Sequence, residues 1–314
     1  MKDKKANHRF RMPMLALAAA TAAMAAACEF REPGASAVDH AFGSTGLGPG
    51  QFSYPRAIAV SPKDGRVFVV DKTARIQRFS AEGEYEHQWR MPEYAHGKPV
   101  GLFVDHRGRV WVPDTHYARV IVYDEDGNEL FRFGERGEGP GQFIFPTSIA
   151  LDRHGNIYVG EYGGNDRINK FTKDRKYLFS FADAASGEGA VARPTQIIFD
   201  KDDVLWVTDA CHHRIARYDS SGKFVSAFGS LGTEEGQLMY PYGMALEEPD
   251  SLVVVDQGNN RIVRFDREGN FLASWGSPGR AIGQVRKPWD LARAEDGRIY
   301  ALDSWNNRVQ VLDW

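Results

Sequence analysis

An internal repeat of about 47 residues constrains the fold of this 314-residue chain more than any other feature. A proline, an acidic residue about 15 positions later and an arginine four to six positions after that acid recur together six times. The prolines are Pro55, Pro99, Pro146, Pro194, Pro241 and Pro288, the acids are Asp71, Asp114, Glu161, Asp209, Asp256 and Asp303, and the arginines are Arg75, Arg119, Arg167, Arg214, Arg261 and Arg308. Self-similarity at such a period is typical of solenoids and propellers.

Each repeat contains four short apolar runs separated by turn residues. In the third repeat the runs cover residues 148–151, 156–160, 167–171 and 177–181. They have the length and the β-branched and aromatic content of strands. Glycine pairs such as Asp64-Gly65 supply the positive φ that tight hairpins need. Four antiparallel strands in each of six repeats predict an all-β fold, a six-bladed β-propeller with four-stranded antiparallel blades.

The two ends of the repeat region predict how the ring closes. The sixth repeat has three strand-like runs and stops at Trp314, whereas residues 38–43 precede the first repeat and end in Phe42-Gly43. This ending matches the fourth-strand endings Phe133-Gly134 and Phe228-Gly229. We therefore expect the N-terminal strand to complete the last blade and remove an open sheet edge. One propeller domain is predicted over residues 38–314.

The first residues have the order of a secretory signal. A basic head is followed by the uncharged stretch 12–27, and three alanines directly precede Cys28. This cysteine resembles that of a bacterial lipobox, which becomes the lipidated N-terminus after cleavage. We predict a signal peptide at 1–27, a linker at 28–37 and an extracytoplasmic lipoprotein, anchored in the membrane of the periplasm or cell surface. The alternative is ordinary secretion after cleavage at the same place.

Charge and cysteine content narrow the partners. The whole chain has a formal charge of −3. Since residues 1–27 carry five basic residues and one acid, residues 28–314 carry −7. A broadly acidic protein is a poor non-specific partner for nucleic acid. Cys28 and Cys211 are the only cysteines, so the sequence predicts no disulfide framework.

The segments between and within the repeats resemble NHL repeats. They are the linkers GLGPGQFSYP (46–55), GEGPGQFIFP (137–146), GTEEGQLMYP (232–241) and GRAIGQVRKP (279–288), and the stretches DQGNNRIVRF (256–265) and DSWNNRVQVL (303–312). The resemblance implies an NHL-repeat propeller but no particular activity, because this propeller serves enzymes, RNA binders and sensor domains. The acidic balance argues against RNA binding. We expect the recurring acid and arginine to pair across the loop between the second and third strands, as part of the scaffold.

The candidate site is the face on which the inter-blade linkers and the loops between strands two and three meet. Residues that differ between repeats on this face are candidates for ligand contact, and those after the prolines are expected to ring the channel mouth. The ligand-binding candidates are Arg56, Thr147, Glu161, Thr195, Tyr242, Trp289 and Trp305. Aromatic walls with a few polar groups are typical of small-molecule sites. The alternative is that these aromatic residues pack between blades.

An enzyme remains the second hypothesis. The resemblance extends distantly to the peptidyl-hydroxyglycine amidating lyase, whose zinc-binding histidines follow the blade-opening prolines; no histidine follows them here. Lactonase-type propellers bind calcium through acids and asparagines at the channel mouth, where Glu161, Asn165 and Asp290 could contribute. The run Cys211-His212-His213, with His116, contains zinc-ligand types, but adjacent residues rarely converge on one ion.

The sequence therefore predicts a binding or protein-interaction module, without catalytic residues, metal or cofactor assigned. The expected partner is a small molecule, peptide, glycan or another exported protein, with membrane contact only through the N-terminal anchor. The alternative is a metal-dependent enzyme, amidating-lyase-like with zinc or lactonase-like with calcium.

Overall fold

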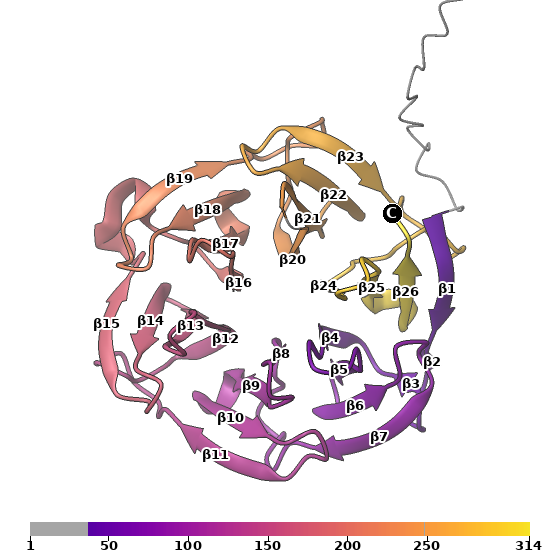
Figure 1. Ribbon diagram of the computed structural model, residues 1–314, viewed down its shortest axis with the longest axis horizontal. Helices are drawn as coiled ribbons and strands as arrows, with labels where there is room; N and C mark the ends of the chain where they lie inside the picture. The colour runs from indigo at the N-terminus through magenta and orange to yellow at the C-terminus, as the bar shows by residue number, and fades with distance from the viewer. Residues whose placement is uncertain (1–36, 248) are drawn as a thin grey trace, which may run out of the picture. The chain divides into compact units, whose positions relative to one another are not determined.

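Each of the six repeats folds into a four-stranded antiparallel sheet, and the sheets surround a central axis in the computed structural model (Figure 1). The structure describes residues 37–247 and 249–314, so the predicted signal segment 1–27 and Cys28 lie outside the described residues. In this part of the chain no helix is long and apolar enough to cross a bilayer. The predicted all-β, six-bladed propeller is confirmed.

The first strand of each blade lies nearest the axis and the fourth lies at the rim (Figure 1). Blade one contains β4 (Pro55–Val60), β5 (Val67–Asp71), β6 (Arg75–Phe79) and β7 (Tyr85–Arg90). Blade two contains β8 (Phe103–Val104), β9 (Val110–Asp114), β10 (Arg119–Tyr123) and β11 (Glu129–Phe133). Blade three contains β12 (Phe145–Leu151), β13 (Ile157–Tyr162), β14 (Arg167–Phe171) and β15 (Tyr177–Phe181).

The second half of the ring repeats this order. Blade four contains β16 (Pro194–Phe199), β17 (Leu205–Asp209), β18 (Arg214–Tyr218) and β19 (Phe224–Phe228). Blade five contains β20 (Pro241–Glu247), β21 (Ser251–Asp256), β22 (Arg261–Asp266) and β23 (Phe271–Trp275). Blade six contains β24 (Asp290–Arg293), β25 (Ile299–Asp303), β26 (Arg308–Leu312) and β1 (Val38–Phe42).

A few short elements join these strands. The first linker contains a parallel pair, β2 (Ser44–Thr45) and β3 (Gln51–Phe52). Single 3-10 turns follow several second strands: η2 (Thr115–Tyr117), η4 (Ala210–His212) and η5 (Ser304–Asn306), whereas η3 (Ala184–Gly189) lies between blades three and four.

The N-terminal strand closes the ring as predicted. β1 pairs with β26 in antiparallel register, with Phe42 opposite Val309 and Ala41 opposite Gln310. The sheet therefore runs β24, β25, β26, β1, and the last blade has a fourth strand from the opposite end of the chain. Closure removes the sheet edge that three strands alone would expose.

The hydrophobic core lies in layers between neighbouring blades. In one layer Phe68 and Val70 of blade one pack with Val110 and Val112 of blade two. The layer at the closure joins Ile58 and other residues of blade one to the buried strands of blade six. Because the second strands are covered on both faces, they are buried along their whole length, and their sequences are continuously apolar up to the final acid.

That final acid pairs with the arginine that opens the third strand, and we name the pair the blade clamp. The arginine-to-carboxylate distances are 2.7–2.9 Å in all six blades, and the acids are fully buried. In blade six the carboxylate of Asp303 also accepts the Arg286 N–H at 2.8 Å, while Arg308 donates to the linker carbonyls of Ala281 and Gln284. The clamp therefore ties two strands to the preceding linker, the scaffold role expected from its recurrence.

Blade two departs from this pattern. Its preceding linker lacks the Gly-Gln step of the other linkers, and the Asp114 carboxylate pairs with Arg119 while its Oδ1 has no hydrogen-bond partner among the described residues. Burial is the main cause that raises the pKa of Asp114 to about 6.

We expect removal of a complete clamp to destabilise the propeller strongly. Asp303→Ala leaves the buried Arg308 and the Arg286 N–H without their acceptor, and should lower the free energy of unfolding by about 3–5 kcal/mol. The control is Asp296→Ala in the same blade, which breaks an ion pair with Arg298 that is largely exposed and should cost at most about 1 kcal/mol. Urea unfolding measures both, and equal losses would contradict the clamp's role.

Candidate functional site

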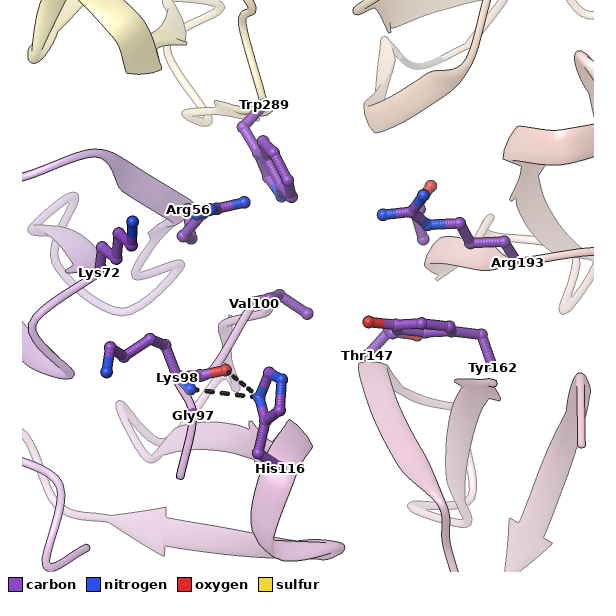
Figure 2. Close-up of a pocket in the computed structure, with 11 residues that line it drawn as sticks. Arg56, Lys72, Gly97, Lys98, Val100, His116, Thr147, Tyr162, Arg193 and Trp289 are labelled. Atoms are coloured by element: carbon purple, nitrogen blue, oxygen red, sulfur yellow. Dashed lines mark hydrogen bonds between the residues drawn. The ribbon is translucent and has the colours of Figure 1, made fainter. Parts of the chain in front are cut away.

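A cavity of about 280 Å³ opens on the face where the linkers and the strand-two-to-three loops meet (Figure 2). We call it the axial cavity. Residues from blades one, two, three, four and six line it, close to the inner ends of the first strands. Its lining residues are Arg56, Lys72, Gly97, Lys98, Val100, His116, Thr147, Tyr162, Arg193, Thr195 and Trp289.

Four of the seven predicted site residues meet at this cavity: Arg56, Thr147, Thr195 and Trp289. Tyr242 lies beside it, with its ring centroid 4.8 Å from that of Trp289 in an edge-on contact. Among the lining residues, the ring of positions after the prolines therefore surrounds the axis, as its symmetry suggested.

Glu161 and Trp305 lie elsewhere. Glu161 is the clamp acid of blade three: it is fully buried and accepts hydrogen bonds from Arg167 and the Ile144 N–H. Trp305 is 49% exposed and packs under the guanidinium of Arg286, with Cζ 5.4 Å from its ring centroid. Neither side chain lines the axial cavity.

The two threonines also serve the scaffold. The Thr147 hydroxyl donates to the Pro194 carbonyl of the next blade at 2.8 Å, and the Thr195 hydroxyl lies 3.1 Å from the Pro241 carbonyl of the blade after that. Their polar groups are therefore partly used in joining blades, and they form the wall of the cavity more than its binding groups.

Two arginines are held against aromatic faces at the cavity. The Arg56 Cζ lies 3.9 Å from the Trp289 ring centroid, and the Arg193 Cζ lies 5.4 Å from the ring centroids of both Tyr162 and Tyr242. Such contacts position a guanidinium through its face and leave its in-plane N–H donors available. Figure 2 shows the two arginines on opposite sides of the cavity, each pointing into it.

Neither guanidinium has a hydrogen-bond or carboxylate partner among the described residues, and the Arg193 Nε is buried without one. Burial lowers the pKa of Arg56, and the nearby Arg193 charge acts in the same direction. Lys72 and Lys98 add positive charge to the wall, and no acidic residue is among the lining residues.

The analysis of positions after the prolines missed Arg193 and Lys98, which directly precede a blade-opening proline. At this position aromatic and basic residues alternate around the ring: Tyr54, Lys98, Phe145, Arg193, Tyr240 and Lys287. That alternation was visible in the sequence and could have identified both residues. The backbone of Arg193 is left-handed, with φ of 61°, and its N–H donates to Asp166 at 2.9 Å.

Blade two contributes most to the cavity. Gly97, Lys98, Val100 and His116 come from its linker, its first segment and η2. The chain passes so close to His116 that a Cβ at Gly97 would lie 1.9 Å from the imidazole Cγ. The His116 Nδ1 is 3.2 Å from both backbone polar atoms of Lys98, which fixes this irregular linker against the loop (Figure 2).

A narrow channel of about 20 Å³ adjoins the cavity and reaches Asp290. This buried carboxylate accepts the Ile58 N–H at 3.0 Å and the Leu291 N–H at 2.8 Å, and so joins blade six to blade one. Ser148 and Gln196 accept a neighbouring blade's N–H from the equivalent position. Burial without a cationic partner raises the pKa of Asp290 to about 7.

This pKa predicts a pH-dependent contribution to stability. An unfolded aspartate titrates near about 3.9. Between that pH and about 7 the folded chain retains a proton that the unfolded chain has lost, so the free energy of unfolding falls with rising pH, by up to about 1.4 kcal/mol per pH unit. The stabilisation is complete below the unfolded pKa and is lost as the pH rises through the folded one.

Asp290→Asn should flatten that part of the profile, because asparagine keeps one acceptor and does not titrate. Chemical unfolding at a series of pH values measures the slope, with the exposed Asp296→Asn as the control. Identical slopes in Asp290→Asn and the unmodified protein would contradict the raised pKa.

The cysteine–histidine run is separated by its local contacts. Cys211 is an exposed free thiol whose pKa burial raises, and His212 Nδ1 lies 2.8 Å from the clamp acid Asp209. His213 is left-handed, with φ of 56°, and its Nδ1 accepts the Tyr240 N–H, the turn role predicted from Asn260 and Asn307. Across residues 37–247 and 249–314 no group of three histidine, cysteine or acidic side chains is placed to hold a metal.

Two family models match the sequence. One, described as a 6-bladed beta-propeller, matches residues 98–166, and the NHL repeat model matches residues 286–312. The chain is an NHL-repeat six-bladed β-propeller. Proteins of this type are ligand-binding or protein-interaction modules.

Three curated relatives share segments of this NHL propeller. Protein brain tumor of Drosophila melanogaster is 33% identical over 95 residues, which are 30% of this chain and 9% of that protein. NHL repeat-containing protein 3 of Homo sapiens is 35% identical over 79 residues, 24% of this chain and 22% of that protein. A probable peptidyl-alpha-hydroxyglycine alpha-amidating lyase of Caenorhabditis elegans is 34% identical over 77 residues, 23% of this chain and 22% of that protein. The chain thus spans less than a quarter of these relatives.

Solved structures share the architecture. A streptogramin B lyase superposes with a TM-score of 0.63 at 17% identity, covering 87% of this chain and 96% of the other. A catalytically inactive virginiamycin B lyase from Staphylococcus aureus, solved with quinupristin, has a TM-score of 0.59 at 20% identity and covers 86% of this chain and 87% of the other. At these identities the likeness shows the fold alone.

Proposed function

We propose that this NHL propeller is an extracytoplasmic binding module that holds a small molecule, or the end of a peptide or glycan, in its axial cavity. The observation that carries the proposal is that partnerless arginines and aromatic side chains converge on one concavity at the axis. Binding sites are typically concave, with apolar and aromatic walls and a few placed polar groups.

The comparison of repeats supports the same proposal. Residues that hold the blades recur in all six repeats, such as the clamp acids and arginines. Arg56, Arg193 and Trp289 do not recur at their positions. Cations without a carboxylate partner stabilise the scaffold little and are costly to desolvate, so their placement is better explained by a ligand.

The lyases of similar fold favour an enzyme as the second candidate. The virginiamycin B lyase solved with quinupristin illustrates a propeller of this architecture with a small molecule. The axial cavity here, however, has four basic side chains and one histidine in its wall, a set suited to an anion more than to a divalent cation. Stoichiometric zinc or calcium in the purified protein would favour the enzyme.

A tryptophan pair in blade six tests binding at the cavity. Native mass spectrometry of the purified full chain should show a small-molecule adduct, which Trp289→Ala should lose or bind about tenfold or more weakly. The control, Trp305→Ala, removes an exposed tryptophan outside the cavity and should keep the adduct. Where Trp289→Ala unfolds, Arg56→Gln replaces it. An adduct unchanged in both cavity variants, or none in the unmodified protein, would contradict the proposal.

The proposed location rests on the sequence order at the N-terminus. We expect Cys28→Ser to move the protein from the membrane fraction of a bacterial host to the soluble exported fraction, because the lipid chains that anchor it would be missing. Cys211→Ser, which changes the thiol within the propeller, should remain in the membrane fraction. Membrane association of Cys28→Ser equal to that of Cys211→Ser would rule out a lipid anchor at Cys28.

A further inference from the structure

We propose that the ligand of the axial cavity carries an oxyanion group, a carboxylate, phosphate or sulfate, that binds between Arg56 and Arg193. The inference rests on the proposed binding function and adds the chemical class of the ligand. It follows from the charge of the cavity wall, the bonding state of the two arginines and the way in which aromatic rings hold them.

The charge of the wall is of one sign. Arg56, Lys72, Lys98 and Arg193 are the charged residues among those that line the cavity, and no aspartate or glutamate lines it. This concentration contrasts with the acidic balance of residues 28–314. Basic residues in a concave site raise the local concentration of anions.

The bonding of these arginines differs from that of the scaffold arginines. Each clamp arginine has a carboxylate at 2.7–2.9 Å, for example Arg261 with Asp256 and Arg308 with Asp303. Arg56 and Arg193 are partly buried, yet neither has such a partner within the described residues. A partly buried cation without a counter-ion costs free energy, and an incoming oxyanion would recover it.

The aromatic rings determine which atoms remain for a ligand. Trp289 contacts Arg56 through the face of the guanidinium, and Tyr162 and Tyr242 lie near Arg193 in the same way. A guanidinium carries its N–H donors in its plane, arranged to bind an oxyanion in a bidentate manner. The buried, partnerless Nε of Arg193 is one such donor. Stacking therefore orients both arginines without using the groups that would bind the anion.

The other end of the inner strands has different chemistry. Further along these strands lies a second cavity of about 380 Å³, lined mainly by aliphatic residues such as Ile58, Leu151 and Leu246. The two cavities are separated by the narrow channel at Asp290. The cationic character is thus confined to the axial cavity, whose remaining wall, with Val100 and Trp289, suits a small apolar or aromatic group attached to the anion.

Three probes of the same shape test the inference by isothermal titration calorimetry on the full chain: phenylacetate, benzylphosphonate and the uncharged phenylacetamide. We expect at least one of the two anions to bind about tenfold or more tightly than the amide. Preference for phenylacetate would indicate a carboxylate ligand, and preference for benzylphosphonate a phosphate or sulfate ligand. Affinity should fall with added salt, because the interaction is between charges.

The variants locate the anion. Arg56→Gln and Arg193→Gln should each weaken the anion about tenfold or more and leave phenylacetamide unchanged. The matched control is Arg286→Gln, which removes an arginine stacked on Trp305 outside the cavity and should bind the anion like the unmodified protein. An equal loss in Arg286→Gln would show general charge attraction and overturn the assignment to Arg56 and Arg193.

Two further outcomes separate this inference from the proposed function. Equal binding of all three probes, lost in Trp289→Ala, would overturn the anion assignment while the binding function stands. Binding by none of the probes also overturns the anion assignment, and the adduct in native mass spectrometry then decides the binding function independently.

Discussion

The buried blade clamp is the interaction on which the rest of the propeller depends. In blade six one carboxylate, Asp303, holds the arginine of the third strand and the N–H of the linker that entered the blade. A buried carboxylate is tolerated only with such a set of partners. The clamp therefore fixes the linker, and with it the residues on both sides of each proline, at the same place in successive blades.

Because the clamps and the inter-blade layers carry stability, the residues at the axis are free to differ. The six positions after the prolines share one geometry and contain arginine, valine, threonine, tyrosine and tryptophan. A repeated scaffold thereby presents a non-repeated cavity. The partnerless Arg56 and Arg193 break the pairing rule that the clamps obey, and such local departures are expected at functional sites.

Blade two shows the cost and the use of a departure. Its irregular linker leaves the clamp acid Asp114 without a backbone donor at Oδ1, and the pKa of that acid rises to about 6. The same linker turns toward the axis with Gly97 and Lys98, and His116 of η2 packs against it. The least regular blade thus contributes most to the axial cavity, where a site needs asymmetry that the repeat cannot supply.

The sequence by itself determined the blades, their order, the clamp pairs and the closure by residues 38–43, because these depend on period, turn chemistry and residues that recur. It also located Arg56 and Trp289 at the axis, since ring symmetry places equivalent positions together. Only the tertiary structure decided that Arg193 enters the cavity, whereas Glu161 serves a clamp and Trp305 stacks with Arg286. These side chains are near the same loops in sequence. Their directions depend on a left-handed backbone at Arg193 and on rings supplied by other blades, neither of which local periodicity contains.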